Sequence, residues 1–215
     1  MDNGQYLKEK DFNDSLSYKE FVDLCENLVA EDKTTGPGQT ENHIKFTKLN
    51  YHRLKRITKT LELDFDTLVA FRNIEENLVW IVLVEAWCGD VAQNLPYIHA
   101  MSQLSDKILL RIILKNKHPE IMKHFLTNGT ESIPKLICVH KSTEKVLWTW
   151  GSRPIDAQKM FVDYKHNPNM TKSEALENIQ RWYISNRGKL IQEEFRNLLV
   201  DCQKILRKKE KEEIF

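Results

Sequence analysis

The chain has 215 residues, of which 41% are hydrophobic and 9% aromatic, and this is enough apolar material for a packed globular core. Because 32 Lys and Arg balance 31 Asp and Glu, the formal net charge of +1 gives no support for a nucleic-acid or membrane-surface partner. Four scattered cysteines without metal-ligand spacing argue against a disulfide scaffold and a zinc site, and the polar residues 2–5 argue against a signal peptide, so we expect a cytoplasmic protein without metal or cofactor.

The N-terminal third is predicted to be helical. Apolar residues recur at helical spacing from residue 18 onward, and Ser17 with Glu20 has the pattern of a capping box. A polar stretch that contains Gly36-Pro37-Gly38 then predicts a loop over residues 31–42. Three helices are expected in this part, over residues 17–30, 47–61 and 66–74.

The middle of the chain alternates strand and helix patterns. Residues 79–84 are continuously apolar and mostly β-branched, which is typical of a central strand covered on both faces. A helical segment near residues 90–104 leads to a second apolar run at 108–114, so the two runs predict parallel strands joined by a right-handed crossover. A helix over residues 118–126 and a hairpin of strands at 135–140 and 145–150 follow.

The C-terminal part returns to helices. Ser152 as a cap and Pro154 in the first turn predict one helix start, and the periodicity of residues 171–209 breaks at Asn186-Arg187-Gly188, which predicts two more helices packed with the N-terminal ones. The chain therefore divides into an N-terminal helical extension, an α/β core and a C-terminal helical extension. The expected bounds are residues 1–77, 78–167 and 168–215.

The segment Trp87-Cys88-Gly89-Asp90 follows the first predicted strand and opens the next helix. A thiol at a helix N-terminus lies near unpaired backbone N–H groups and the positive end of the helix dipole, and both stabilise a thiolate. The Asp90 carboxylate opposes this effect by repulsion, and the sequence leaves the net direction open.

This segment resembles the active site of the thioredoxin family, whose usual form is Trp-Cys-Gly-Pro-Cys. Ile133-Pro134 resembles the cis-proline segment that faces the cysteines in that family, and Pro96 falls where the family carries a kinking proline. The resemblance implies a thioredoxin-like core of order βαβαββα, a central mixed sheet flanked by helices. It also implies a substrate groove beside Cys88, and its expected lining is Trp87, Gly89, Ile133, Pro134, Trp150, Gly151 and Arg153.

The chain departs from the family pattern at three positions. Val91 stands where the family has its resolving cysteine, Asp90 replaces the intervening proline, and Val82 stands where the family has a buried proton-transfer acid. Glu85 is a candidate substitute acid or base near the thiol, or a carboxylate that faces solvent or caps the nearby helix. Arg153 either holds a carboxylate or phosphate in the groove or stacks on Trp150 at the surface.

Two functions remain open from the sequence. The first is monothiol redox chemistry, in which Cys88 forms a mixed disulfide with a protein or low-molecular-weight thiol or disulfide substrate and an external thiol resolves it. The second is a redox-inactive binding module that keeps the fold and its groove. A peroxidase or iron–sulfur carrier has less support, because no threonine lies near Cys88 and the tetrapeptide differs from that of the cluster binders.

Overall fold

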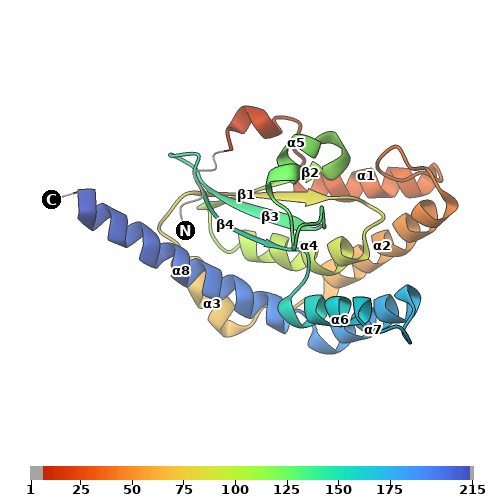
Figure 1. Cartoon of the computed structure of the whole chain (residues 1–215). Coiled ribbons are helices and arrows are strands. Elements are labelled where there is room, and N and C mark those ends of the chain that lie inside the picture. Colours follow the sequence, from red (N-terminus) through yellow and green to blue (C-terminus); the bar gives the residue numbers. More distant parts are fainter. Residues whose placement is uncertain (1–6, 214–215) are drawn as a thin grey trace.

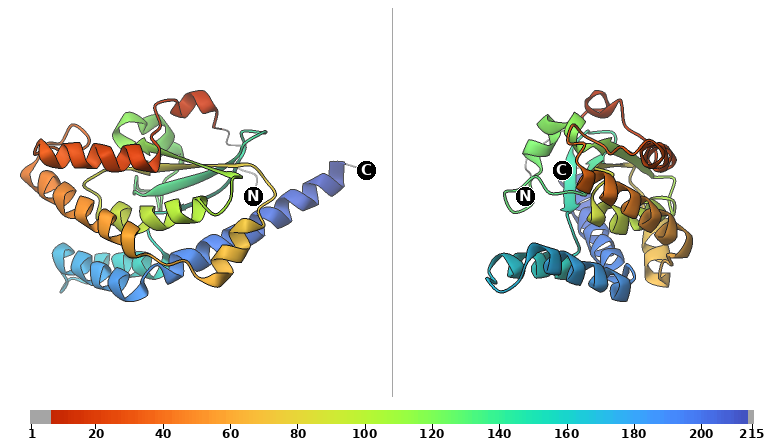
Figure 2. Two further views of the ribbon diagram at one scale, coloured as in Figure 1. Left: turned by 180° about the vertical axis from the view of Figure 1, so that it is seen from behind. Right: turned by 90° about the vertical axis from the view of Figure 1, so that its right-hand side faces the viewer.

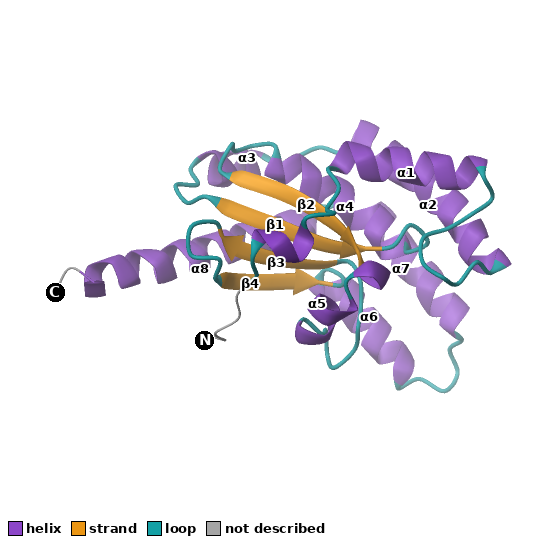
Figure 3. Ribbon diagram, turned by 90° about the horizontal axis from the view of Figure 1, so that it is seen from above, coloured by secondary structure: helices purple, strands orange, loops and turns teal. Residues whose placement is uncertain are grey.

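The computed structural model describes residues 7–213, with side chains up to residue 204 and the backbone alone for residues 205–213. The polar residues 2–5, which argue against a signal peptide, lie outside the described part. A four-stranded mixed sheet forms the centre of the molecule in the order β2-β1-β3-β4 (Figure 3). Strand β1 runs parallel to β2 and antiparallel to β3, and β4 is antiparallel to β3. The strands are β1 (Leu78–Val84), β2 (Ile108–Leu114), β3 (Lys135–His140) and β4 (Val146–Gly151).

The sheet is stabilised by burial of the apolar side chains that its central strand, β1, carries on both faces. All seven residues of β1 are buried, as the continuous apolar run predicts. The outer edge of β2 is covered in part by the N-terminal segment, since Leu16 exchanges two backbone hydrogen bonds with Ile112, of 2.7 and 2.9 Å. This pairing leaves less of the edge open to another chain.

Helices lie on both sides of the sheet. In Figure 1, α5 (Pro119–His124) lies on one side, and α4 (Gly89–Ser102), α3 (Phe65–Arg72) and α8 (Lys189–Glu213) lie on the other. Short 3-10 turns occur at Glu9–Phe12 and Lys115–Lys117. The architecture is thus the predicted α/β fold, a mixed sheet flanked by helices and extended by further helices at both ends.

The first extension contains α1 (Tyr18–Ala30) and α2 (Glu41–Thr60), which contact each other, and α2 also packs against α4 (Figure 2). The capping box predicted for α1 is confirmed, because the Ser17 hydroxyl accepts from the Glu20 amide while the Glu20 carboxylate accepts from the Ser17 amide. Helix α2 begins six residues earlier than predicted, since Thr40 caps the amide of His43. Asp64 caps α3 through the amide of Thr67.

After β4, α6 (Ile155–Lys165) is the last helix of the expected core, and the second extension contains α7 (Lys172–Asn186) and α8, with the predicted break between them. Helix α8 is held to the sheet by Phe195, whose buried ring packs against the rings of Trp80, Trp148 and Trp150 at centroid distances of 5.3 to 5.8 Å. The prediction for the start of α6 is wrong. Pro154 occupies the N-cap position, and the Ile155 amide donates to Glu194 of α8 at 2.6 Å, so the cap comes from another helix rather than from Ser152.

Candidate functional site

The turn between β1 and α4 carries Cys88. The strand ends at Val84 and the helix begins at Gly89, so Cys88 is the N-cap residue of α4. Across from it, the Ile133–Pro134 peptide bond is cis, and the Cys88 thiol donates to the Ile133 carbonyl with an Sγ–O distance of 3.4 Å. The turn and the proline segment, which are far apart in the sequence, therefore meet at the thiol.

The Cys88 side chain is held in its neutral form. Burial raises its pKa to about 12, the Asp90 carboxylate adds to the rise, and the amides of Val91 and Asp90 oppose it. Only 8% of the residue's surface is exposed. Since the thiolate is the nucleophile, this raised pKa lowers the thiolate fraction of Cys88 at neutral pH.

Asp90 forms a buried ion pair one residue beyond the helix start. Its carboxylate lies 2.6 Å from the Arg153 guanidinium, and the two side chains are only 9% and 10% exposed. The Tyr183 hydroxyl donates to the other carboxylate oxygen at 3.0 Å. Burial raises the pKa of Asp90, while Arg153 and Tyr183 act in the opposite direction.

Arg153 therefore pairs with a carboxylate of the protein itself, a partner that the sequence did not predict. Its guanidinium carbon also lies 4.2 Å from the centre of the Phe161 ring, so the aromatic partner is Phe161 and not Trp150. The positive charge that the sequence offers to a ligand of the groove is neutralised by Asp90.

Both helical extensions cover the turn. A Cβ atom added at Gly89 would lie 3.4 Å from the Gln180 amide nitrogen of α7 and 3.7 Å from the Arg53 guanidinium of α2. The Asn50 amide donates to the Trp87 carbonyl at 2.8 Å, and the Trp87 ring stacks on His43 with 4.8 Å between centroids. Side chains from α2 and α7 therefore close over the residues that precede and follow Cys88.

Glu85 is buried and contacts a different part of the protein. Its carboxylate accepts from the Asn116 amide at 2.8 Å, and the adjacent Ala86 amide donates to the hydroxyl of Thr35 at 2.9 Å. Burial raises the pKa of Glu85, and hydrogen bonds with Thr35 and Asn116 lower it. These contacts tie the loop that contains Thr35 and the turn after β2 to the end of β1. The carboxylate is therefore buried rather than facing solvent, and the amide that it binds belongs to the turn after β2 and not to helix α4.

Two other predicted groove residues serve packing within the fold. The Trp150 indole nitrogen donates to Glu194 at 2.6 Å, and its ring lies against Phe195, so this side chain belongs to the interface with α8. Gly151 has a φ of +129°, and a Cβ there would overlap the Pro134 carbonyl oxygen. A residue without a side chain is therefore required for β4 to approach the cis-proline segment.

Sequence reasoning missed the partners of Asp90. Asn94 donates to the Asp90 carbonyl at 2.8 Å and to the Tyr183 hydroxyl at 2.9 Å, and Gln93 donates to Gln180 at 2.8 Å. The adjacent amides Gln93 and Asn94 in an otherwise apolar helix were a signal, because buried polar groups need partners. Tyr183 gave no such signal, since it lies on an apolar helical stripe.

Comparison with known proteins agrees with this geometry. The family model described as thioredoxin matches residues 36–179, which is more than half of the chain. The chain belongs to the thioredoxin family. No curated protein matches it.

Two solved structures are similar to this thioredoxin-family chain. A Pseudomonas aeruginosa protein of unknown function aligns with a TM-score of 0.54 and 16% identity over 87% of this chain and 98% of its own, which supports the fold alone. An HIV epitope scaffold aligns with a TM-score of 0.48 and 16% identity over 89% of this chain and 98% of its own.

Two further features of the described residues bear on function. They contain no group of three or more His, Cys, Asp or Glu side chains placed to hold a metal ion. Within the same part of the chain, no helix has both the length and the apolar character of a bilayer span.

The other cysteines, Cys25, Cys138 and Cys202, are free and buried, which confirms their predicted place in the core.

Proposed function

We propose that this thioredoxin-family chain is a binding module that does not turn over thiols or disulfides at Cys88. The observation that carries the proposal is the state of the Cys88 thiol, which is buried, donates to the Ile133 carbonyl and has a pKa raised to about 12. A group with this pKa is a neutral thiol at pH 7, and neutral thiols do not attack disulfides at useful rates.

The surroundings of Cys88 support the same function. Val91 provides no second thiol and Val82 no proton-transfer acid, so a mixed disulfide at Cys88 would have no resolving group beside it. By resemblance to the family, the backbone at Ile133 would pair with an extended substrate. Here its carbonyl already accepts the Cys88 thiol.

Monothiol redox chemistry is the second candidate, and one observation favours it. The amides of Asp90 and Val91 and the Arg153 guanidinium all lower the pKa of Cys88, and burial together with the Asp90 carboxylate outweighs them. If α2 and α7 moved away from the turn, burial would fall while the amides remained. Cys88 would then have the features of a reactive cysteine at a helix start.

Alkylation of Cys88 by iodoacetamide as a function of pH tests the two functions. Mass spectrometry identifies the labelled cysteine, Cys88→Ser gives the background, and protein in urea shows the rate of the unhindered thiol. The binding module predicts labelling of the folded protein far slower than in urea, with an apparent pKa above about 8.5, and no reduction of a disulfide substrate in the presence of glutathione. Fast labelling with an apparent pKa below that value would refute the proposal in favour of the monothiol enzyme.

A further inference from the structure

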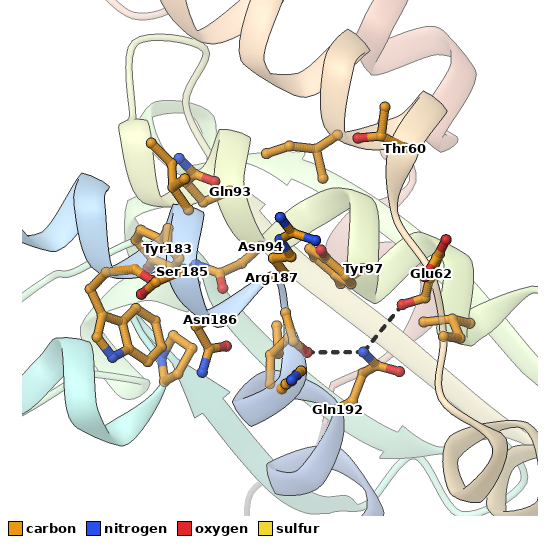
Figure 4. A pocket seen from close by; sticks show the side chains of 18 of the residues that line it. Thr60, Glu62, Gln93, Asn94, Tyr97, Tyr183, Ser185, Asn186, Arg187 and Gln192 are labelled. Carbon is orange, nitrogen blue, oxygen red and sulfur yellow. Dashed lines mark hydrogen bonds between the residues drawn. The ribbon is translucent and has the colours of Figure 1, made fainter.

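A cavity of about 1000 Å³ lies between the end of α2, helix α4 and the turn that joins α7 to α8. Its volume is at the upper end of the range for small-molecule sites in proteins. Figure 4 shows side chains from all three parts of the chain directed into the same space, among them Asn94, Tyr97 and Arg187. No residue of the thiol turn, 85–90, lines the cavity.

Cationic side chains dominate the charge of this cavity. Arg56, Arg181, Arg187 and Lys189 line it, against the carboxylates of Glu62 and Asp64. Asp64 is already neutralised, because both of its carboxylate oxygens lie 2.8 Å from Arg196. Arg181 is likewise paired, since its guanidinium lies 3.5 Å from the Glu177 carboxylate. Without these two pairs, the lining carries three positive charges, on Arg56, Arg187 and Lys189, and one negative charge, on Glu62, so the potential inside favours an anion.

Apolar and neutral polar groups complete the lining. Ile57, Trp182 and Ile191 provide apolar surface, while Asn94 and Gln93 provide amides. Tyr97 is largely buried, and burial raises its pKa, with Arg187 lowering it and Glu62 raising it. Its hydroxyl is therefore neutral at pH 7 and able to donate a hydrogen bond, with charges of both signs close by.

The turn between α7 and α8 fixes the position of these groups. Arg187 and Gly188 both have positive φ values, of 52° and 71°. A Cβ at Gly188 would overlap the Tyr97 ring, so the glycine lets the turn sit directly on α4. Gln192 braces the other side, since its amide donates to the carbonyls of Glu62 and Gly188 at 3.3 and 3.1 Å (Figure 4).

We propose that this cavity binds a small organic anion. Its carboxylate or phosphate group lies against Arg56 and Arg187, and its apolar body packs against Ile57 and Trp182. The inference rests on the proposed function and gives the binding module a site and a ligand class. The cavity shares a wall with the polar network around Asp90, because Asn94 lines it and hydrogen-bonds both the Asp90 carbonyl and Tyr183.

The test uses two fluorescent probes with the same aromatic body. The anion 8-anilino-1-naphthalenesulfonate and its neutral analogue N-phenyl-1-naphthylamine are titrated into the full-length protein. We expect 1:1 binding of the anion at the cavity and at least about tenfold weaker binding of the neutral analogue, since a charge-assisted hydrogen bond is commonly worth a factor of ten or more. Equal affinity for the two probes, or no binding of the anion, would overturn the proposal.

Three variants locate the site. Arg56→Gln combined with Arg187→Asn removes two cations, and asparagine suits the left-handed backbone at position 187. Thr60→Trp fills the cavity from the end of α2 without changing its charge. The matched control, Lys59→Gln, removes a charge from α2 outside the lining. The double variant and Thr60→Trp each weaken binding of the anion by about tenfold or more, and Lys59→Gln leaves it within about twofold.

The remaining outcomes decide the ligand class. Circular dichroism and thermal unfolding establish that each variant is folded, and a variant that is folded but binds the anion like the original protein would refute this location. Competition with phenylacetate and with phenyl phosphate distinguishes a carboxylate from a phosphate ligand, and failure of both to displace the probe would refute the ligand class. Titration of the fluorescent anion into Cys88→Ser separates the two proposals, because the anion should bind this variant as it binds the original protein. Loss of the cavity site should likewise leave the labelling of Cys88 unchanged, so each proposal can fail without the other.

Discussion

The ion pair between Asp90 and Arg153 gives the sharpest test of how the candidate site is held together. Arg153→Met removes the charge but keeps an unbranched side chain that can still contact the Phe161 ring. Because the two paired side chains are only 9% and 10% exposed, the change leaves an uncompensated carboxylate in the interior. Removal of one partner of a buried pair typically costs about 3–5 kcal/mol.

Urea unfolding followed by tryptophan fluorescence measures this cost. With an m-value of about 3 kcal/mol per M for a chain of this length, the unfolding midpoint of Arg153→Met should fall by about 1–2 M at pH 7. The double variant Asp90→Asn with Arg153→Met should recover most of the loss, because it leaves no buried charge and the asparagine oxygen can still accept from Tyr183. The control Arg196→Met breaks a more exposed pair with Asp64 and should cost no more than about 1 kcal/mol.

The pH dependence of the same variant has a definite sign. Burial raises the pKa of Asp90 in the folded state, and loss of Arg153 removes the main opposing effect. A carboxyl whose folded pKa lies above its unfolded value favours folding below the unfolded pKa and loses that contribution as the pH rises through the folded pKa. The stability deficit of Arg153→Met is therefore largest at pH 7 and shrinks toward pH 4. A deficit below about 1 kcal/mol at pH 7, or one that does not vary with pH, would show that the pair does not hold the site as argued.

Three further predictions concern single groups. Glu85→Gln should become more stable relative to the original protein as the pH rises from 4 to 7 in urea titrations, since burial raises the pKa of Glu85 and its ionised form opposes folding; a parallel pH profile would contradict this. Gly188→Ala should lower stability by about 2 kcal/mol or more in thermal unfolding, because it strains a positive φ and overlaps Tyr97, and a neutral effect would refute the fit of that turn. Tyr183→Phe should cost about 1–2 kcal/mol by urea unfolding through the lost hydrogen bond to Asp90, an effect that Asp90→Asn should reduce.

The sheet could be predicted from the sequence because its signals are local. The apolar runs of β1 and β2 each predict a strand, and the polar link predicts the turn of the hairpin, without reference to the rest of the chain. Strand β3 has the predicted bounds, Lys135–His140, and β4 is displaced by one residue at each end. Helix caps made by neighbouring residues, such as Ser17 with Glu20, were equally readable.

Elements whose ends depend on distant partners were predicted less well. The Ile155 amide at the start of α6 donates to Glu194 of α8, and no local sequence pattern predicts a partner so distant in the chain. The prediction of Ser152 as the cap was therefore wrong. The resemblance to the thioredoxin family implied that Trp150 lies beside the thiol, yet its indole nitrogen donates to Glu194 and its ring packs against Phe195 of α8. In both cases the C-terminal helix supplies the partner.

The state of Cys88 follows from the same dependence on distant residues. Its position at the start of α4 and the opposing charge of Asp90 could be predicted from the sequence. Their net effect on the pKa of Cys88 depends on how much water reaches the turn. That access is set by Gln180, which lies close to Gly89, and by Tyr183, which lies 93 residues from its partner Asp90. A helix dipole stabilises a thiolate only where the competing cost of desolvation is small. In this chain burial raises the pKa of Cys88 although the thiol lies at a helix start, and α2 and α7 pack over the adjacent Gly89.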